Sequence, residues 1–247
     1  MSVGDRYRQV LLGLKDWDAY LLEQSRLPGP RANLELAQTA ADVGGRAQFR
    51  KWSAINPKAA PVNTPGEFLV VCGVLGYGRL LAEGDSKALA GIRRAARDPR
   101  WRVREAAAIA LQRVGDRDVG RLLAVVDPWA EGSPLEQRAA AAALCEPRLL
   151  KDIHHSARVL AILDRITASF ASTRDRDSDE FEALKKGLGY CWSVAVAANP
   201  RVGKPMLEHW SRSKDRHVRW VMRENLKKAR LKRVDPAWVD RMAERLA

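Results

Sequence analysis

An aromatic side chain and a carboxylate stand four residues apart at Trp101 and Glu105. On a helix this spacing projects both side chains from one face as neighbours. An indole ring attracts positive charge, and a carboxylate stabilises the cationic sugar that develops as a glycosidic bond breaks. The pair therefore fits a cationic alkylated purine, which is a good leaving group without a proton donor. The alternative is structural: Trp101 packs between adjacent helices and Glu105 neutralises nearby arginines.

Most other catalytic signatures are absent from the sequence. It contains no Walker loop, GxGxxG, GxSxG or HExxH motif, so nucleotide hydrolysis and zinc proteolysis are not expected. His154 and His155 would diverge by about 100° on a helix and do not easily share a metal ion. Cys72, Cys145 and Cys191 lie in apolar helical contexts, so we expect small core residues. We expect no metal and no cofactor.

The elements that carry these residues are predicted to be helices. Apolar residues recur at i, i+3 and i+4 through most of the chain, and alternation typical of strands is scarce, so we predict an all-α fold. Asp98-Pro99 begins the most informative helix, an apolar stripe of small residues follows, and Gly115-Asp116 is expected to end it. Small residues let a neighbouring helix approach closely. This segment resembles a HEAT repeat, in which antiparallel helical pairs stack into a solenoid.

Parts of this segment return later in the chain. An Arg-Ala-Ala helix recurs at 132–144, where Arg138 follows Arg104 by 34 residues, and Asp-x-x-Val-Arg recurs at Asp215. One helical pair cannot bury its own apolar face and needs neighbours. We therefore predict an α-solenoid of HEAT-like repeats over residues 1–247, as a single domain. It comprises degenerate N-terminal helices at 1–64, central repeats at 65–171 and basic C-terminal repeats at 180–247.

The same patterns predict the bounds of individual helices and loops. The polar segment 172–179 is too hydrophilic to pack and is predicted to be a loop. Helices are expected around 7–24, 33–56 and 65–82, joined by Pro/Gly-containing linkers at 27–31 and 57–65.

Positive charge is concentrated in two segments. The chain has 43 Lys and Arg against 30 Asp and Glu, a formal net charge of +13, while residues 201–233 alone carry +9 and residues 93–121 carry +5. Stacked repeats could align such segments into a groove for a duplex phosphate backbone. The alternative is that they are solvated outer faces. The expected phosphate contacts are Arg102, Arg104, Arg138, Arg212, Lys214, Arg216, Arg219, Arg223, Lys227, Lys228 and Arg230.

Three short motifs resemble the HEAT-like-repeat alkylpurine DNA glycosylases, the D family of bacterial alkylation repair. Trp101-x-x-x-Glu105 is similar to the family's Trp-x-x-x-Asp pair. The QRAA run at 137–140 matches the Gln-Arg-Ala-Ala of the next repeat. The LGYCW run at 188–192, followed by NPRV at 199–202, is similar to an Ile-Gly-Trp helix followed by Asn-Pro-x-Val.

The resemblance implies a role for each matched residue. Glu105 would be the catalytic carboxylate, Trp101 would contact the lesion, and Arg138 would hold the DNA backbone. Tyr190 or Trp192 would pack against the lesion nucleotide. The Trp220-Val-Met-Arg-Glu segment is a competing match to that aromatic helix.

Several functional hypotheses remain open. The first is a protein that binds double-stranded DNA, with DNA glycosylase activity as a candidate function. The second is a non-catalytic HEAT-repeat scaffold for an acidic protein partner. The third is RNA binding or an accessory role in RNA modification, which shares the charge argument.

The expected location is the cytoplasm. The first ten residues, MSVGDRYRQV, contain no apolar leader segment, and the three cysteines form no CxxC pair. The longest apolar run, 68–75, is shorter than the roughly 20 residues that a membrane span requires. No membrane partner is expected.

Overall fold

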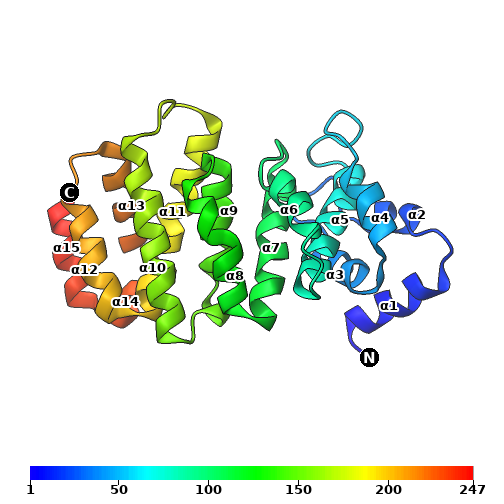
Figure 1. Cartoon of the computed structure of the whole chain (residues 1–247), viewed down its shortest axis with the longest axis horizontal. Helices are drawn as coiled ribbons and strands as arrows, with labels where there is room; N and C mark the ends of the chain where they lie inside the picture. The colour runs from blue at the N-terminus through cyan, green and yellow to red at the C-terminus, as the bar shows by residue number, and fades with distance from the viewer. Residues whose placement is uncertain (247) are drawn as a thin grey trace. The chain divides into compact units, whose positions relative to one another are not determined.

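The computed structural model describes residues 1–246, and these form helices and no strand, which confirms the all-α prediction (Figure 1). The chain divides into two compact units, Met1–Arg117 (unit 1) and Asp118–Ala247 (unit 2). The sequence patterns predict no boundary at this point, and a single solenoid through both units stays a prediction.

Unit 1 contains seven helices. The helices expected around 7–24 and 33–56 each form as two shorter ones, and the helix expected at 65–82 forms as a whole. In chain order they are α1 (Val3–Gly13), α2 (Asp18–Glu23), α3 (Leu34–Val43), α4 (Arg46–Ser53), α5 (Pro65–Ala82), α6 (Ala88–Ala96) and α7 (Trp101–Arg117).

Helix α5 is the core of unit 1, because it contacts α2, α3, α4, α6 and α7. Among residues 1–246 it is the one helix long and apolar enough to cross a membrane. Within unit 1, however, 72% of it is buried. Other helices thus cover its apolar surface, as expected for the core helix of a packed domain.

Helix α7 packs closely on α5 through small residues. A Cβ built on Gly78 of α5 would stand 2.6 Å from both the Cα and the carbonyl oxygen of Ala110. Ala106, Ala107 and Ala110 are buried, which confirms the small apolar stripe predicted for α7. The predicted end at Gly115-Asp116 is wrong by a short distance: α7 continues to Arg117, because Val114 and Gly115 are still packed in the core.

Unit 2 contains the recurring motifs. The Arg-Ala-Ala run lies on α9 and the Asp-x-x-Val-Arg run begins α13, while residues 172–178 form no helix, as predicted. In chain order the elements are α8 (Val119–Val126), η1 (Asp127–Glu131), α9 (Pro134–Leu144), η2 (Pro147–Leu149), α10 (Ile153–Ala168), η3 (Ser169–Ala171), α11 (Asp179–Ala198), α12 (Pro200–Ser211), α13 (Arg216–Leu226), α14 (Ala229–Val234) and α15 (Pro236–Leu246).

Side-chain caps explain why the repeated motifs begin helices. At the start of α9, the hydroxyl of Ser133 accepts a hydrogen bond from the Glu136 N–H, and the Glu136 carboxylate accepts one from the Ser133 N–H. Asp215 caps α13 by accepting from the N–H groups of His217 and Val218. Both caps satisfy N–H groups that lack a partner within the helix.

Helical pairs in unit 2 contact one another in series. The second helices of three pairs contact in the order α9, α11, α13, and the first helices contact in the order α8, α10, α12. Helix α11 lies at the centre, since it contacts α9, α10, α12, α13 and α14. Helix α11 also has exposed residues, and these include Lys186 and Tyr190.

Substitution of Gly78 tests the close contact between α5 and α7. We expect Gly78→Val to lower the free energy of unfolding by about 1–3 kcal/mol, since the new side chain would collide with the backbone at Ala110. This loss corresponds to a fall in Tm of several degrees, roughly 2–4 °C per kcal/mol. Gly13→Val is the matched control, because a Cβ there meets nothing within 4 Å. Equal melting temperatures for the two variants would contradict the proposed contact.

Candidate nucleic-acid interface

Helix α7 carries the aromatic and carboxylate pair. Trp101 is its first residue and is 46% exposed, and Glu105 follows one turn later with intermediate exposure. The guanidinium carbon of Arg102 lies 4.4 Å from the centroid of the indole. A tryptophan that joined adjacent helices would be buried, so this exposure argues against the packing role of Trp101 in the structural alternative.

The prediction that Arg102 binds phosphate is wrong. Its side chain is only 8% exposed, and its guanidinium lies 3.3 Å from the buried Glu67 carboxylate. It also donates to the Gly29 carbonyl at 2.6 Å and to the Asn63 side chain at 3.1 Å. Arg102 therefore joins the two loops around residues 29 and 63 in the interior of unit 1, where a charged group requires such partners.

Arg104 organises the turn that precedes α7. Its guanidinium donates to the carbonyl oxygens of Asp98 at 2.7 Å and Pro99 at 2.9 Å. These contacts give Arg104 a structural role at the start of the helix that carries Trp101.

Of the three candidate aromatic residues in unit 2, Tyr190 is the one most open to solvent. Tyr190 is 45% exposed, whereas Trp192 is fully buried and donates from Nε1 to the Thr167 hydroxyl at 3.0 Å. Trp192 is thus a core residue, and its predicted contact with a lesion is wrong. Trp220 is partly buried, and the Lys185 ammonium lies 4.9 Å from its ring centroid.

Glycine at position 189 permits α13 to pack closely on α11. A Cβ on Gly189 would lie 3.1 Å from the Trp220 ring and 3.3 Å from Glu224 Cβ. Helix α13 therefore approaches α11 directly beside Tyr190, and a larger residue in the Leu-Gly-Tyr motif would push the two helices apart.

A buried amide fixes α11 on both sides of Tyr190. Asn225 of α13 is fully buried, and its Oδ1 accepts from the Ser193 N–H at 2.7 Å. Its Nδ2 donates to the Leu188 carbonyl at 2.8 Å and to the Val221 carbonyl at 2.8 Å. All these groups are far from water, so the loss of the amide would leave several unsatisfied polar groups.

Arg230 holds the exposed ring of Tyr190 from α14. The guanidinium carbon of Arg230 lies 4.4 Å from the ring centroid, and Nη2 donates to the phenolic oxygen. A guanidinium has five N–H donors, so the remaining ones stay available to an anion next to the ring. Sequence reasoning grouped Arg230 with the phosphate contacts but missed this stack, because 40 residues separate the two partners.

Arg138 lies against the same helix, α11, and is half-buried. A Cβ on Gly187 would lie 3.3 Å from Cγ of Arg138, so the arginine of α9 crosses α11 about one turn before Tyr190. Its neighbour Gln137 is nearly buried and donates from Nε2 to the Ala130 carbonyl at 2.8 Å and to the Ser169 hydroxyl at 3.0 Å. Gln137 thereby fixes the start of α9 and orients the arginine that follows.

The basic residues of α13 differ in their environments. Arg219 and Arg223 both donate to the Leu246 carbonyl, at 3.3 and 2.6 Å, and so stabilise the end of α15. Arg216, Arg223 and Lys227 fall within about 40° of one another around the helix, so they form one basic stripe. Arg212 lines a small cavity with Arg219, and the remaining predicted contacts are the exposed Lys214 and the half-buried Lys228.

Comparison of the chain with protein-family models, curated proteins and solved structures finds no match. The functional assignment therefore depends on the geometry of these side chains.

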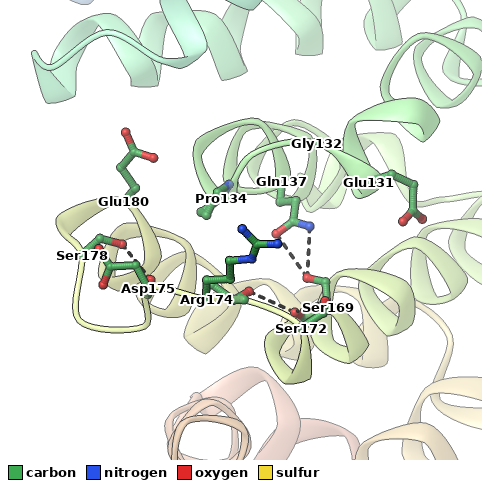
Figure 2. A pocket seen from close by; sticks show the side chains of 11 residues that line it. Glu131, Gly132, Pro134, Gln137, Ser169, Ser172, Arg174, Asp175, Ser178 and Glu180 are labelled. Carbon is green, nitrogen blue, oxygen red and sulfur yellow. Dashed lines mark hydrogen bonds between the residues drawn. The ribbon is translucent and has the colours of Figure 1, made fainter.

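A second feature of unit 2, a pocket of about 670 Å³, lies beside the loop that precedes α11. Figure 2 shows Arg174 extending from this loop toward Gln137, with Asp175 and Glu180 near the opposite side. The loop is anchored, since Arg176 forms an ion pair with Asp215 at the start of α13. The pocket is lined by both acidic and basic side chains, so it favours no single class of ligand. The sequence predicted only a polar loop here.

The three cysteines are buried, which confirms their prediction as core residues. Burial raises the pKa of the Cys72 and Cys145 thiols, so neither is readily a thiolate nucleophile. Residues 1–246 contain no group of three or more His, Cys, Asp and Glu side chains that could hold a metal ion.

Alanine substitutions distinguish the exposed aromatic residue from the buried one. We expect Trp192→Ala to lower the free energy of unfolding by about 3–5 kcal/mol, because it leaves a large cavity and removes the hydrogen bond from the indole to the Thr167 hydroxyl. Tyr190→Ala should cost less than about 1.5 kcal/mol, since its ring is nearly half exposed. Urea denaturation measures both values. Equal losses would show that Tyr190 is also a structural residue.

Proposed function

We propose that unit 2 binds duplex DNA through the exposed face of α9, α11, α13 and α14. The observation that carries this proposal is the stack of Arg230 on the half-exposed Tyr190 ring. Arg138 crosses the same helix one turn away, and the basic stripe of α13 lies on the neighbouring helix. Cations on adjacent helices match a phosphate backbone, and an aromatic ring among them offers a surface for a base or sugar.

Salt dependence tests this proposal directly. A protein that contacts six or more phosphates loses about a thousandfold in affinity between 50 and 200 mM salt. We expect this slope for a fluorescent DNA duplex in an anisotropy titration, and the double variant Lys228→Ala/Arg230→Ala should reduce the slope by about two phosphate contacts.

Arg158→Ala is the matched control for this titration. Arg158 is an exposed arginine of α10, and α10 contacts α11 from the layer of first helices. The control should therefore leave the slope unchanged. A shallow slope for the wild-type protein, or equal effects of both variants, would contradict the proposal and favour an acidic protein partner. Tighter binding of an RNA duplex would favour the RNA-binding hypothesis.

Excision of cationic alkylated purines is a second candidate function. It is favoured by the exposure of Trp101 one helical turn before Glu105 on α7. In this reaction the bond between the sugar C1′ and the purine nitrogen breaks, and its electrons neutralise the cationic purine. The Glu105 carboxylate stabilises the oxocarbenium ion, and water adds to C1′ and loses a proton.

Release of free base from methylated duplex DNA tests this second candidate. We expect Glu105→Gln to slow release by about 100-fold or more, because the amide lacks the negative charge that stabilises the sugar cation. Glu83→Gln is the matched control, since Glu83 is an exposed carboxylate at the end of α5. Binding of DNA without any release by the wild-type protein would leave the binding proposal intact and contradict catalysis.

A further inference from the structure

A second pocket of unit 2, of about 620 Å³, lies beside the stacked Arg230 and Tyr190 pair. Its walls come from the last turns of α11, from η2 and the residues after it, and from α14. This volume is in the range of pockets that hold small molecules. The pocket shares Arg230 with the proposed face of α9, α11, α13 and α14, but it is a local cavity at the C-terminal end of α11.

The charged side chains that line this pocket are all cationic: Lys151, Arg230 and Arg233. Lys151 and Arg233 are exposed, and neither forms an ion pair with another residue in the range 1–246. The nearest acidic residues in the sequence, apart from the helix cap Asp152, are already paired: Glu146 with Arg148 at 3.1 Å, and Asp235 with Lys204 at 2.6 Å. The pocket thus retains a positive potential that an anion would neutralise.

The floor of the pocket is apolar. Leu150 and Val194 are buried, and the side chains of Ala197 and Ala198 leave room above them. Such a surface accepts the face of a planar group, as bases stack on apolar and aromatic side chains. The C-terminal end of α11 carries partial negative charge, so an anionic group is expected at the cationic rim and away from this floor.

These features select one chemical class of ligand. A phosphomonoester carries a charge between about −1.5 and −2 at neutral pH, whereas an internal phosphodiester carries a single charge. Three cations around an apolar floor therefore fit a phosphomonoester attached to a planar base better than they fit the interior of a strand. We propose that this pocket binds a nucleoside 5′-monophosphate group, with the phosphate on Lys151, Arg230 and Arg233 and the base over Val194 and Ala197.

Two sources could supply this group: the 5′-phosphorylated end of a DNA strand, or a free mononucleotide. The first source rests on the proposed DNA binding by the same unit, and the second does not. An experiment with both kinds of probe separates them.

The first arm compares two blunt DNA duplexes of one sequence, with an internal fluorophore, that differ only in 5′-phosphate or 5′-hydroxyl ends. We expect the phosphorylated duplex to bind about tenfold more tightly. The double variant Lys151→Ala/Arg233→Ala should remove this difference, while Arg158→Ala should preserve it. Ala197→Trp should also remove it, because the indole fills the pocket while every cation remains.

The second arm titrates adenosine 5′-monophosphate, adenosine and inorganic phosphate by NMR. The pocket is supported if the monophosphate binds at least about tenfold more tightly than adenosine or inorganic phosphate, and if Ala197→Trp abolishes this binding. This result would support the pocket even if no duplex binds. Equal affinities for inorganic phosphate and the monophosphate would contradict the proposed contact of the base with Val194 and Ala197. Duplex binding with no effect of the 5′-phosphate and no binding of the monophosphate overturns the pocket proposal, while the DNA-binding proposal stands. Circular dichroism checks that each variant is folded.

Discussion

Close packing of a neighbouring helix against a glycine is the constraint on which each unit depends. In unit 1 the backbone of α5 at Gly78 meets that of α7 at Ala110, which fixes the helix that carries Trp101 and Glu105. In unit 2 the ring of Trp220 lies directly on α11 at Gly189. Dispersion contacts fall steeply with separation, so one added methyl group at either contact would disturb the packing around it. The positions of the candidate functional side chains follow from these contacts.

The contact at Gly189 brings a polar side chain to the backbone of α11. Asn225 reaches the Ser193 N–H and the Leu188 carbonyl because α13 lies so close, and these two groups flank Tyr190 in the sequence. A buried amide must point its oxygen at a donor and its nitrogen at acceptors, since each polar group left without a hydrogen bond costs free energy. It therefore fixes the rotation of α11, and this rotation turns Tyr190 outward while Trp192 faces the core.

Local patterns in the sequence predicted much of the fold and less of the site. The recurring Arg-Ala-Ala and Asp-x-x-Val-Arg motifs and the apolar periodicity were sufficient to identify α9 and α13, because such patterns are local. Such patterns could not decide between Tyr190 and Trp192. The two residues lie about 200° apart on a helix, and the neighbouring helices decide which of them is buried. The same limit applies to Arg102, whose partners Gly29 and Asn63 are distant in the sequence.

The net charge of the chain overstates the positive charge that a ligand can reach. Arg100 is 2% exposed and bound to Asp98, and Arg102 is buried and bound to Glu67. In contrast, Arg230 is fixed by a neutral aromatic ring, which orients its guanidinium and leaves its charge uncompensated. A cation held in this way attracts an anion without first losing an acidic partner and with little loss of side-chain entropy. The stack of Arg230 on Tyr190 is therefore the point in unit 2 where the proposed phosphate contact is expected first.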